Sequence, residues 1–336
     1  MKHFLCVSIH LLLIGMIFSQ QSQLPIERLK PDLYNIRKPA PPKATGETQR
    51  SSFSVNRAFL QSFTVSPRST MRIKGEKGTK VIFPKQCFVD STGSVISSDI
   101  RIEMLEAYSK ADLVLNHLQT VCGEGLLESG GTIYLNAYLN DTAVALQEGT
   151  SFEISFPTDD KQWDMSIFYG DTTREEINWI SNQAAGDYLR QNVFGGGFST
   201  LFKRAPLRKK MRDYKKIDKY IRQSTRLGWI NCDRLIQIQN SEKFDLAVTV
   251  SDSSELTVYL VFHAMNSVMS RFCREGQTTF SYVPINKPLT VFGIKQTSDN
   301  ILYGSKKIRL SENQSVHLNL EPISESELLA RMEELD

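Results

Sequence analysis

The feature that most constrains this chain is the alternation of apolar and polar residues in short runs. In "DIRIEMLEA", residues 99–107, Ile100 and Ile102 fall on one side of an extended chain, and Arg101 and Glu103 fall on the other. A period of two residues is typical of a β-strand with one buried face. Similar runs ("KVIFP", "GTIYLNAYL" and "SFEISFP") are separated by turn sequences such as "DSTGS" and "ESGG". Many short strands joined by such turns predict an antiparallel β-sandwich over residues 53–157.

A second series of short β-like runs covers residues 226–322, including "WINCDRLIQI", "LTVYLVFHAM" and "PLTVFGIKQ". Turns rich in Asp, Ser, Asn and Gly separate these runs, which predicts a second antiparallel sandwich. In residues 323–336, "ISESELLARMEELD", Ser324 is suited to cap a helix whose apolar face includes Leu328 and Met332. The predicted fold class is therefore mainly β, with two antiparallel β-sandwich domains and a short C-terminal helix.

Residues 158–225 lose the alternation and contain a glycine triplet at 195–197, so we expect a flexible, partly helical linker between the domains. Apolar residues recur there at helical intervals of three and four, at Leu207, Met211, Tyr214, Ile217 and Ile221. Cationic residues fill the remainder of this predicted amphipathic helix: Arg208, Lys209, Lys210, Arg212, Lys215, Lys216 and Lys219.

Two interpretations of this basic helix remain open. Its charge would attract an acidic surface, such as phospholipid head groups, an anionic polysaccharide or an acidic patch on a partner. The simpler interpretation is a solvated helix that packs on its own protein. We expect no binding to nucleic acid, which an exported chain seldom meets.

Export is indicated by the first residues, "MKHFLCVSIHLLLIGMIFSQQSQ". A lysine, a short apolar run and a small residue before polar residues are typical of a signal peptide, here residues 1–19 with cleavage between Ser19 and Gln20. Residues 20–52 are rich in Pro, Gln and charge and predict a disordered leader. No apolar run approaches the roughly 20 residues of a transmembrane helix. We therefore expect a periplasmic or envelope-associated protein with no transmembrane span, for which peripheral membrane contact is an option.

The segment "GTKVIFPKQCFVDSTGSVISSDIRIEMLEA" and the segment "LLESGGTIYLNAY" together resemble the ZU5-like β-sandwich. That domain occurs in ankyrins and netrin receptors and, in a variant form, in exported proteins of Bacteroidetes. The resemblance covers about residues 70–157 and implies a sandwich for the first domain.

The segments "LGWINCDRL" and "TVFGIK" and the ending "PISESELLARMEELD" resemble a group of uncharacterised exported Bacteroidetes proteins. This resemblance implies the two-domain architecture and the envelope location. It implies no activity.

Four cysteines follow the predicted signal peptide: Cys87, Cys122, Cys232 and Cys273. An oxidising compartment permits one disulfide in each domain, Cys87 with Cys122 and Cys232 with Cys273. The alternative, which we favour, is buried free thiols. None of the four forms a C-x-x-C pair, and the three remaining histidines lack helical ligand spacing, so we expect neither a metal site nor a cofactor.

The segment "LGWINCDRL", residues 227–235, looks most like a functional site. Strand alternation places Trp229, Asn231 and Asp233 on one face, and Ile230 and Cys232 on the other. Together with Arg234, the aromatic, amide and carboxylate groups of the first face suit a surface that binds sugar or peptide. The structural alternative is that Asp233 pairs with a nearby cation and Trp229 covers the sandwich edge.

A catalytic interpretation of the same segment needs a base beside Cys232, usually a histidine. His263, at the end of "VYLVFHAM", is the candidate. Because Cys232 shares its face with Ile230, we expect it to lie in a core instead. The sequence thus favours an exported non-enzymatic protein that binds or scaffolds an envelope protein or glycan. The alternative is an envelope hydrolase acting on glycan or peptide through Cys232, Asp233 and His263.

Overall fold

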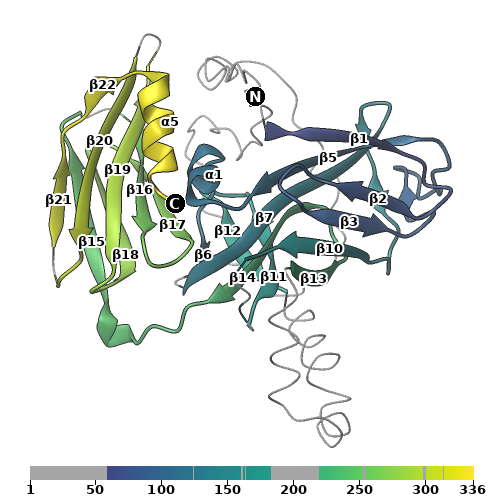
Figure 1. The fold of residues 1–336 in the computed structure, drawn as a ribbon, viewed down its shortest axis with the longest axis horizontal. Helices are drawn as coiled ribbons and strands as arrows, with labels where there is room; N and C mark the ends of the chain where they lie inside the picture. Colours follow the sequence, from purple (N-terminus) through teal and green to yellow (C-terminus); the bar gives the residue numbers. More distant parts are fainter. Residues whose placement is uncertain are drawn as a thin grey trace, which may run out of the picture.

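A computed structural model gives the fold (Figure 1). The predicted signal peptide with its Ser19–Gln20 cleavage site, the leader and the predicted helical cations Arg208, Lys209, Lys210, Arg212, Lys215 and Lys216 lie outside the described residues. The structure describes residues 59–123, 125–159, 162, 164–182, 219–252, 255–297, 300–312 and 314–336.

The described part of the chain is mainly β, as predicted, and its largest sheet is antiparallel and eight-stranded. Its main path runs β1 (Gln61–Val65), β5 (Ile100–Ala107), β7 (Gly125–Leu139), β14 (Gly228–Leu235), β11 (Ser166–Asp171) and β12 (Asn178–Ser181). The short strands β6 (Val121–Cys122) and β8 (Thr142–Ala143) also pair with β7.

A four-stranded antiparallel sheet packs against one face of this sheet and completes the first sandwich. Its order is β13 (Lys219–Ser224), β10 (Phe152–Pro157), β3 (Lys80–Phe83) and β2 (Met71–Lys74). The core between the two sheets contains aromatic side chains such as Phe83 and Phe152, whose ring centroids lie 4.6 Å apart. The strands β4 (Phe88–Val89) and β9 (Ala145–Leu146) form a two-stranded ribbon, and Phe88 also enters this core.

The second sandwich has a separate core between a three-stranded and a five-stranded sheet. The smaller sheet is β18 (Gln277–Pro284), β15 (Lys243–Val250) and β21 (Ser315–Leu318), and a 3-10 turn at Asn240–Glu242 precedes β15. The larger is β17 (Ser267–Cys273), β16 (Leu256–Phe262), β19 (Pro288–Gln296), β20 (Ile301–Arg309) and β22 (Glu321–Ile323). One pairing departs from the antiparallel prediction, since β15 and β21 run parallel.

Four described strands from outside residues 53–157 belong to the first sandwich: β11, β12, β13 and β14. β14 pairs with β7, with Gly228 opposite Leu135, and with β11, where Ser166 lies opposite Asp233. β11 and β12 lie in the stretch predicted as a linker, and β14 was predicted to open the second sandwich. The first sandwich therefore extends to Leu235, because a strand's pattern of alternation does not reveal which sheet it joins.

The end of the predicted basic helix also has a different structure. Lys219 and Ile221, expected on one helix, lie in strand β13 and pair with Pro157 and Ser155 of β10. Pairing with β10 and burial of Tyr220 in the sandwich core outweigh the helical spacing of the apolar residues in this segment.

The two sandwiches share a third apolar core, which we call the seam (Figure 1). It lies between the outer face of the eight-stranded sheet, the outer face of the five-stranded sheet and the helices α1 (Lys110–Leu115) and α5 (Glu325–Glu333). Its buried members include Trp179, Trp229, Tyr259, Val268 and Met332. As predicted, Ser324 caps α5, since its side chain accepts from the backbone N–H of Glu327. Among the described residues, no helix has the length and apolar character that a membrane span requires.

Candidate functional site

The segment predicted to bind a ligand lies in the seam. Ile230 and Cys232 enter the first core, and Trp229 lies on the opposite face, as alternation predicted. That opposite face is not open to solvent, because Trp229 is only 5% exposed and Asn231 and Asp233 are fully buried. The predicted ligand surface is therefore wrong for these three residues: the occupant of this face is the second sandwich of the same chain.

Asn231 and Asp233 belong to a polar chain within the seam. The Ser129 hydroxyl donates to Asn231 Oδ1 at 3.2 Å, and Asn231 Nδ2 donates to Asp233 Oδ2. Burial raises the pKa of the Asp233 carboxyl well above its ordinary value, although hydrogen bonds from Ser129 and Asn231 act in the opposite direction. Arg234 is also engaged, since its Nε donates to Glu128 Oε2 at 2.7 Å and its Nη1 lies 3.5 Å from Asp164 Oδ1.

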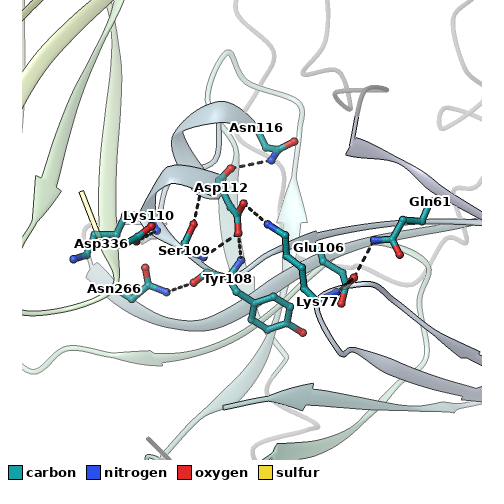
Figure 2. A network of polar contacts seen from close by, with 10 residues as sticks. All are labelled: Gln61, Lys77, Glu106, Tyr108, Ser109, Lys110, Asp112, Asn116, Asn266 and Asp336. Atoms are coloured by element: carbon teal, nitrogen blue, oxygen red, sulfur yellow. Dashed lines mark hydrogen bonds and ion pairs between the residues drawn. The ribbon is translucent and has the colours of Figure 1, made fainter. Parts of the chain in front are cut away.

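The seam carries a second polar network around α1 (Figure 2). Asp112 Oδ2 accepts from the backbone N–H groups of Tyr108 and Ser109, and Asp112 Oδ1 pairs with Lys77. The backbone N–H of Lys110 donates to Asp336 Oδ1 at 2.7 Å, and its Nζ donates to the carbonyl of Leu335 at 3.0 Å. These contacts join the β2–β3 hairpin, α1 and the C-terminal segment.

The four cysteines have free thiols, as favoured, and neither of the two possible disulfides is present; Cys122 is only half-buried. Cys87 and Cys232 lie in the core of the first sandwich and Cys273 in that of the second, which separates the possible pair Cys232 and Cys273. Burial raises the pKa of Cys87 to about 11 and also raises the pKa values of Cys122 and Cys273. Raised thiol pKa values disfavour the reactive thiolate at neutral pH.

The residues of the hydrolase alternative occupy three different environments. Cys232 is in the first core, Asp233 is in the seam, and His263 is exposed on the turn after β16. His263 Nε2 lies 2.8 Å from the Thr290 hydroxyl, and burial lowers its pKa, helped by the charges of Lys110 and Lys307. The structure does not bring the three side chains together as nucleophile, base and orienting carboxylate.

A surface that the sequence analysis missed lies on the outer face of the four-stranded sheet. Alternation turns Met71, Ile73, Val81, Phe83 and Tyr220 into the core and their strand neighbours outward. We call the outward set the cationic sheet face, defined by Arg72, Lys74, Lys80 and Lys219. Lys219 is the one cation of the predicted basic helix that the structure describes, and it belongs to this face.

A buried carboxylate fixes the hairpin that carries three of these cations. Glu106 accepts from the backbone N–H groups of Lys77 and Thr79 in the turn between β2 and β3, each at 2.9 Å. A Cβ atom on Gly75 would lie 2.2 Å from Glu106 Oε2, so a side chain at this position would have to displace the carboxylate. This packing holds Lys74 and Lys80 opposite each other on adjacent strands.

Positive charge outnumbers negative charge on the part of the cationic sheet face that the structure describes. Among the described residues no ion pair involves its four cations, and Glu153 is the one carboxylate at an outward position of these strands. Like charges directly opposite each other, such as Lys74 and Lys80, destabilise a sheet by up to about 1 kcal/mol. Sheet stability therefore does not explain this arrangement.

Two apolar residues interrupt the cations. Ile82 is half-buried and lies opposite both Arg72 and Glu153. Ile221 is 45% exposed and lies two positions from Lys219 on the same face of β13. The face therefore offers positive charge together with apolar contact area.

Comparisons of this chain with protein-family models, curated proteins and solved structures give no match. The function is therefore argued from the geometry. The sequence did carry a signal for the cationic sheet face, since "MRIKGEKGTKVIF" alternates Arg72, Lys74 and Lys80 with apolar residues. Residues 208–219 carry a denser run of positive charge, so the contact with an acidic surface was predicted there instead.

Proposed function

We propose that this chain is an exported, non-enzymatic protein of the bacterial cell envelope that binds or scaffolds an anionic partner through the cationic sheet face. The observation that carries the proposal is the pair Lys74 and Lys80, which forms no ion pair with a described residue and is flanked by Arg72 and Lys219 on one sheet face. A locally unfavourable arrangement of this kind is typical of a functional surface.

The seam supports the scaffolding part of the proposal. A shared apolar core with Trp179 and Trp229 and hydrogen bonds across it hold the two sandwiches in a fixed relation. A partner bound to the first sandwich would therefore be held at a defined position relative to the second.

The test is recovery of envelope components on the purified, tagged protein. The variant Arg72→Gln/Lys74→Gln/Lys80→Gln removes three cations from the cationic sheet face without touching the core. The matched control, Lys287→Gln/Lys306→Gln/Lys307→Gln, removes the same charge from exposed positions of the second sandwich. We expect the wild type and the control to retain the same specific envelope component, and the first variant to retain none of it. Equal recovery by all three proteins would contradict the proposal.

A further inference from the structure

We infer that the anionic partner of the cationic sheet face is the head-group surface of an anionic phospholipid bilayer. This inference rests on the proposed function and narrows it to one class of partner. It is carried by the close spacing of the cations on one sheet face, the kind of cation the face offers and the apolar residues between the cations.

The spacing of the cations suits contact with a layer of charged head groups. Neighbouring strands lie about 4.8 Å apart and alternate residues along a strand about 7 Å apart. Lys74 and Lys80 are direct cross-strand partners, and Arg72 lies two positions from Lys74 on β2. Three charges thus occupy one small area of a sheet face and can meet a layer of phosphate groups at the same time.

The outward side chains are poorly suited to a glycan or to a structured acidic partner. Three of the four cations are lysines, whose compact charge attracts anions without the fixed bidentate geometry of arginine. None of the outward positions on these four strands carries an aromatic ring on which a sugar ring would stack. The apolar residues at these positions are Ile82, Pro157 and Ile221.

The apolar residues favour a membrane surface, which offers apolar contacts as well as charge, over a purely ionic partner. Ile221 is 45% exposed and lies near Lys219 and Ser155 on the outer face of the sheet, away from the protein core. Surfaces that lie on membranes combine lysine or arginine with exposed apolar residues, which enter the boundary between head groups and acyl chains. Ile221 would make this contact while the cations bind phosphate.

The experiment is cosedimentation of the purified full chain with vesicles at low ionic strength. One set of vesicles contains phosphatidylcholine alone, and the other contains about one third phosphatidylglycerol. We expect binding to the anionic vesicles only, and its decrease with added salt. Each basic residue near an anionic surface strengthens binding by about fivefold, so Arg72→Gln/Lys74→Gln/Lys80→Gln should weaken it by about 100-fold.

Two further variants sharpen the test. Lys287→Gln/Lys306→Gln/Lys307→Gln has the same net charge as the first variant and should bind within about twofold of the wild type. Ile221→Ser should weaken binding by several fold and leave the salt dependence unchanged. If both triple variants weaken binding equally, the attraction follows net charge and the inference is overturned.

The inference and the proposed function can fail separately. If the wild type ignores anionic vesicles but retains an envelope protein or glycan that Arg72→Gln/Lys74→Gln/Lys80→Gln loses, lipid is the wrong partner and the binding function stands. If that variant behaves as the wild type towards vesicles and envelope material alike, both are overturned.

Discussion

Asn266 and Ser129 join the two sandwiches through a reciprocal pair of hydrogen bonds. The side-chain Nδ2 of Asn266, on the turn between β16 and β17, donates to the carbonyl of Ser129 on β7 at 3.0 Å. The backbone N–H of Ser129 donates to the carbonyl of Asn266 at 2.8 Å. The same Nδ2 also donates to the carbonyl of Tyr108 at 2.8 Å (Figure 2).

Asn266→Ala should therefore destabilise the whole chain. The substitution removes the donor to two carbonyls of the first sandwich, which costs about 1–3 kcal/mol of unfolding free energy. Urea denaturation followed by tryptophan fluorescence measures the loss. Asn319→Ala, at an exposed position, is the control and should change stability by less than about 0.5 kcal/mol. Equal stability of the two variants would show that the Asn266 contacts do not hold the seam.

The buried carboxyl of Asp233 makes stability depend on pH. Its folded pKa is raised by burial, so its contribution to stability is present at low pH and is lost as the pH rises through the folded pKa. Asp233→Asn keeps the shape but cannot ionise. We expect this variant to gain stability over the wild type as the pH increases from about 4, the ordinary aspartate pKa, with a slope of at most about 1.4 kcal/mol per pH unit.

Urea denaturation of both proteins from pH 4 to pH 8 gives this difference. Other groups, including the neighbouring Glu128 and its partner Arg234, are present in both proteins and largely cancel. A difference in unfolding free energy that does not vary with pH would mean that the folded pKa of Asp233 is not raised above the unfolded value, and would contradict the prediction.

Lys80→Glu should increase the stability of the protein while it weakens binding to the anionic partner. The substitution replaces a like-charge pair with an opposite-charge pair across β2 and β3, which is expected to stabilise the sheet by about 0.5–1 kcal/mol at low salt. Thermal unfolding measures the gain, which should shrink in 1 M salt. Binding of the anionic partner should weaken in the same variant. A loss of stability would argue that Lys80 has a structural partner.

All four thiols should react with an alkylating agent without prior reduction. Alkylation with iodoacetamide in denaturant, without reductant, should modify Cys87, Cys122, Cys232 and Cys273, because each has a free thiol. In the folded protein the half-buried Cys122 should react before the three buried thiols. Mass spectrometry distinguishes these states. A pair of thiols that becomes alkylated only after reduction would identify a disulfide.

The export hypothesis predicts a processed N-terminus. Protein isolated from the periplasm or envelope should begin at Gln20, because the signal peptide is expected to end at Ser19. Intact mass and N-terminal sequencing measure this directly. An unprocessed chain in the cytoplasm would contradict the hypothesis.

The sequence predicted the face of a strand on which a side chain lies better than it predicted which strands pair. In β14 the period of two correctly separated Ile230 and Cys232 from Trp229, because side-chain direction in a strand is a local property. It did not reveal that β14 pairs with β7, where Trp229 lies opposite Tyr134, nearly a hundred residues earlier. For the same reason the sequence could not show that the face bearing Trp229 is covered by another part of the chain.

The short strands of the predicted linker escaped detection for a related reason. β12 spans only Asn178–Ser181, which is too short for alternation to stand out. Trp179 is nevertheless fully buried, and its Nε1 donates to the carbonyl of Gln119 at 2.6 Å. Tertiary packing, rather than a local pattern, defines this segment.

The position of β14 inside the eight-stranded sheet has a consequence for the order in which the chain can fold. β14 lies between β7 and β11, so it joins β11 and β12 to the rest of that sheet. Until residue 235 has left the ribosome or the translocation channel, β7 lacks this neighbour and β11 has no strand to connect it to β7. A fragment cut at residue 157 or 225 would lack the same strand, and the exposed edge of β7 would invite aggregation.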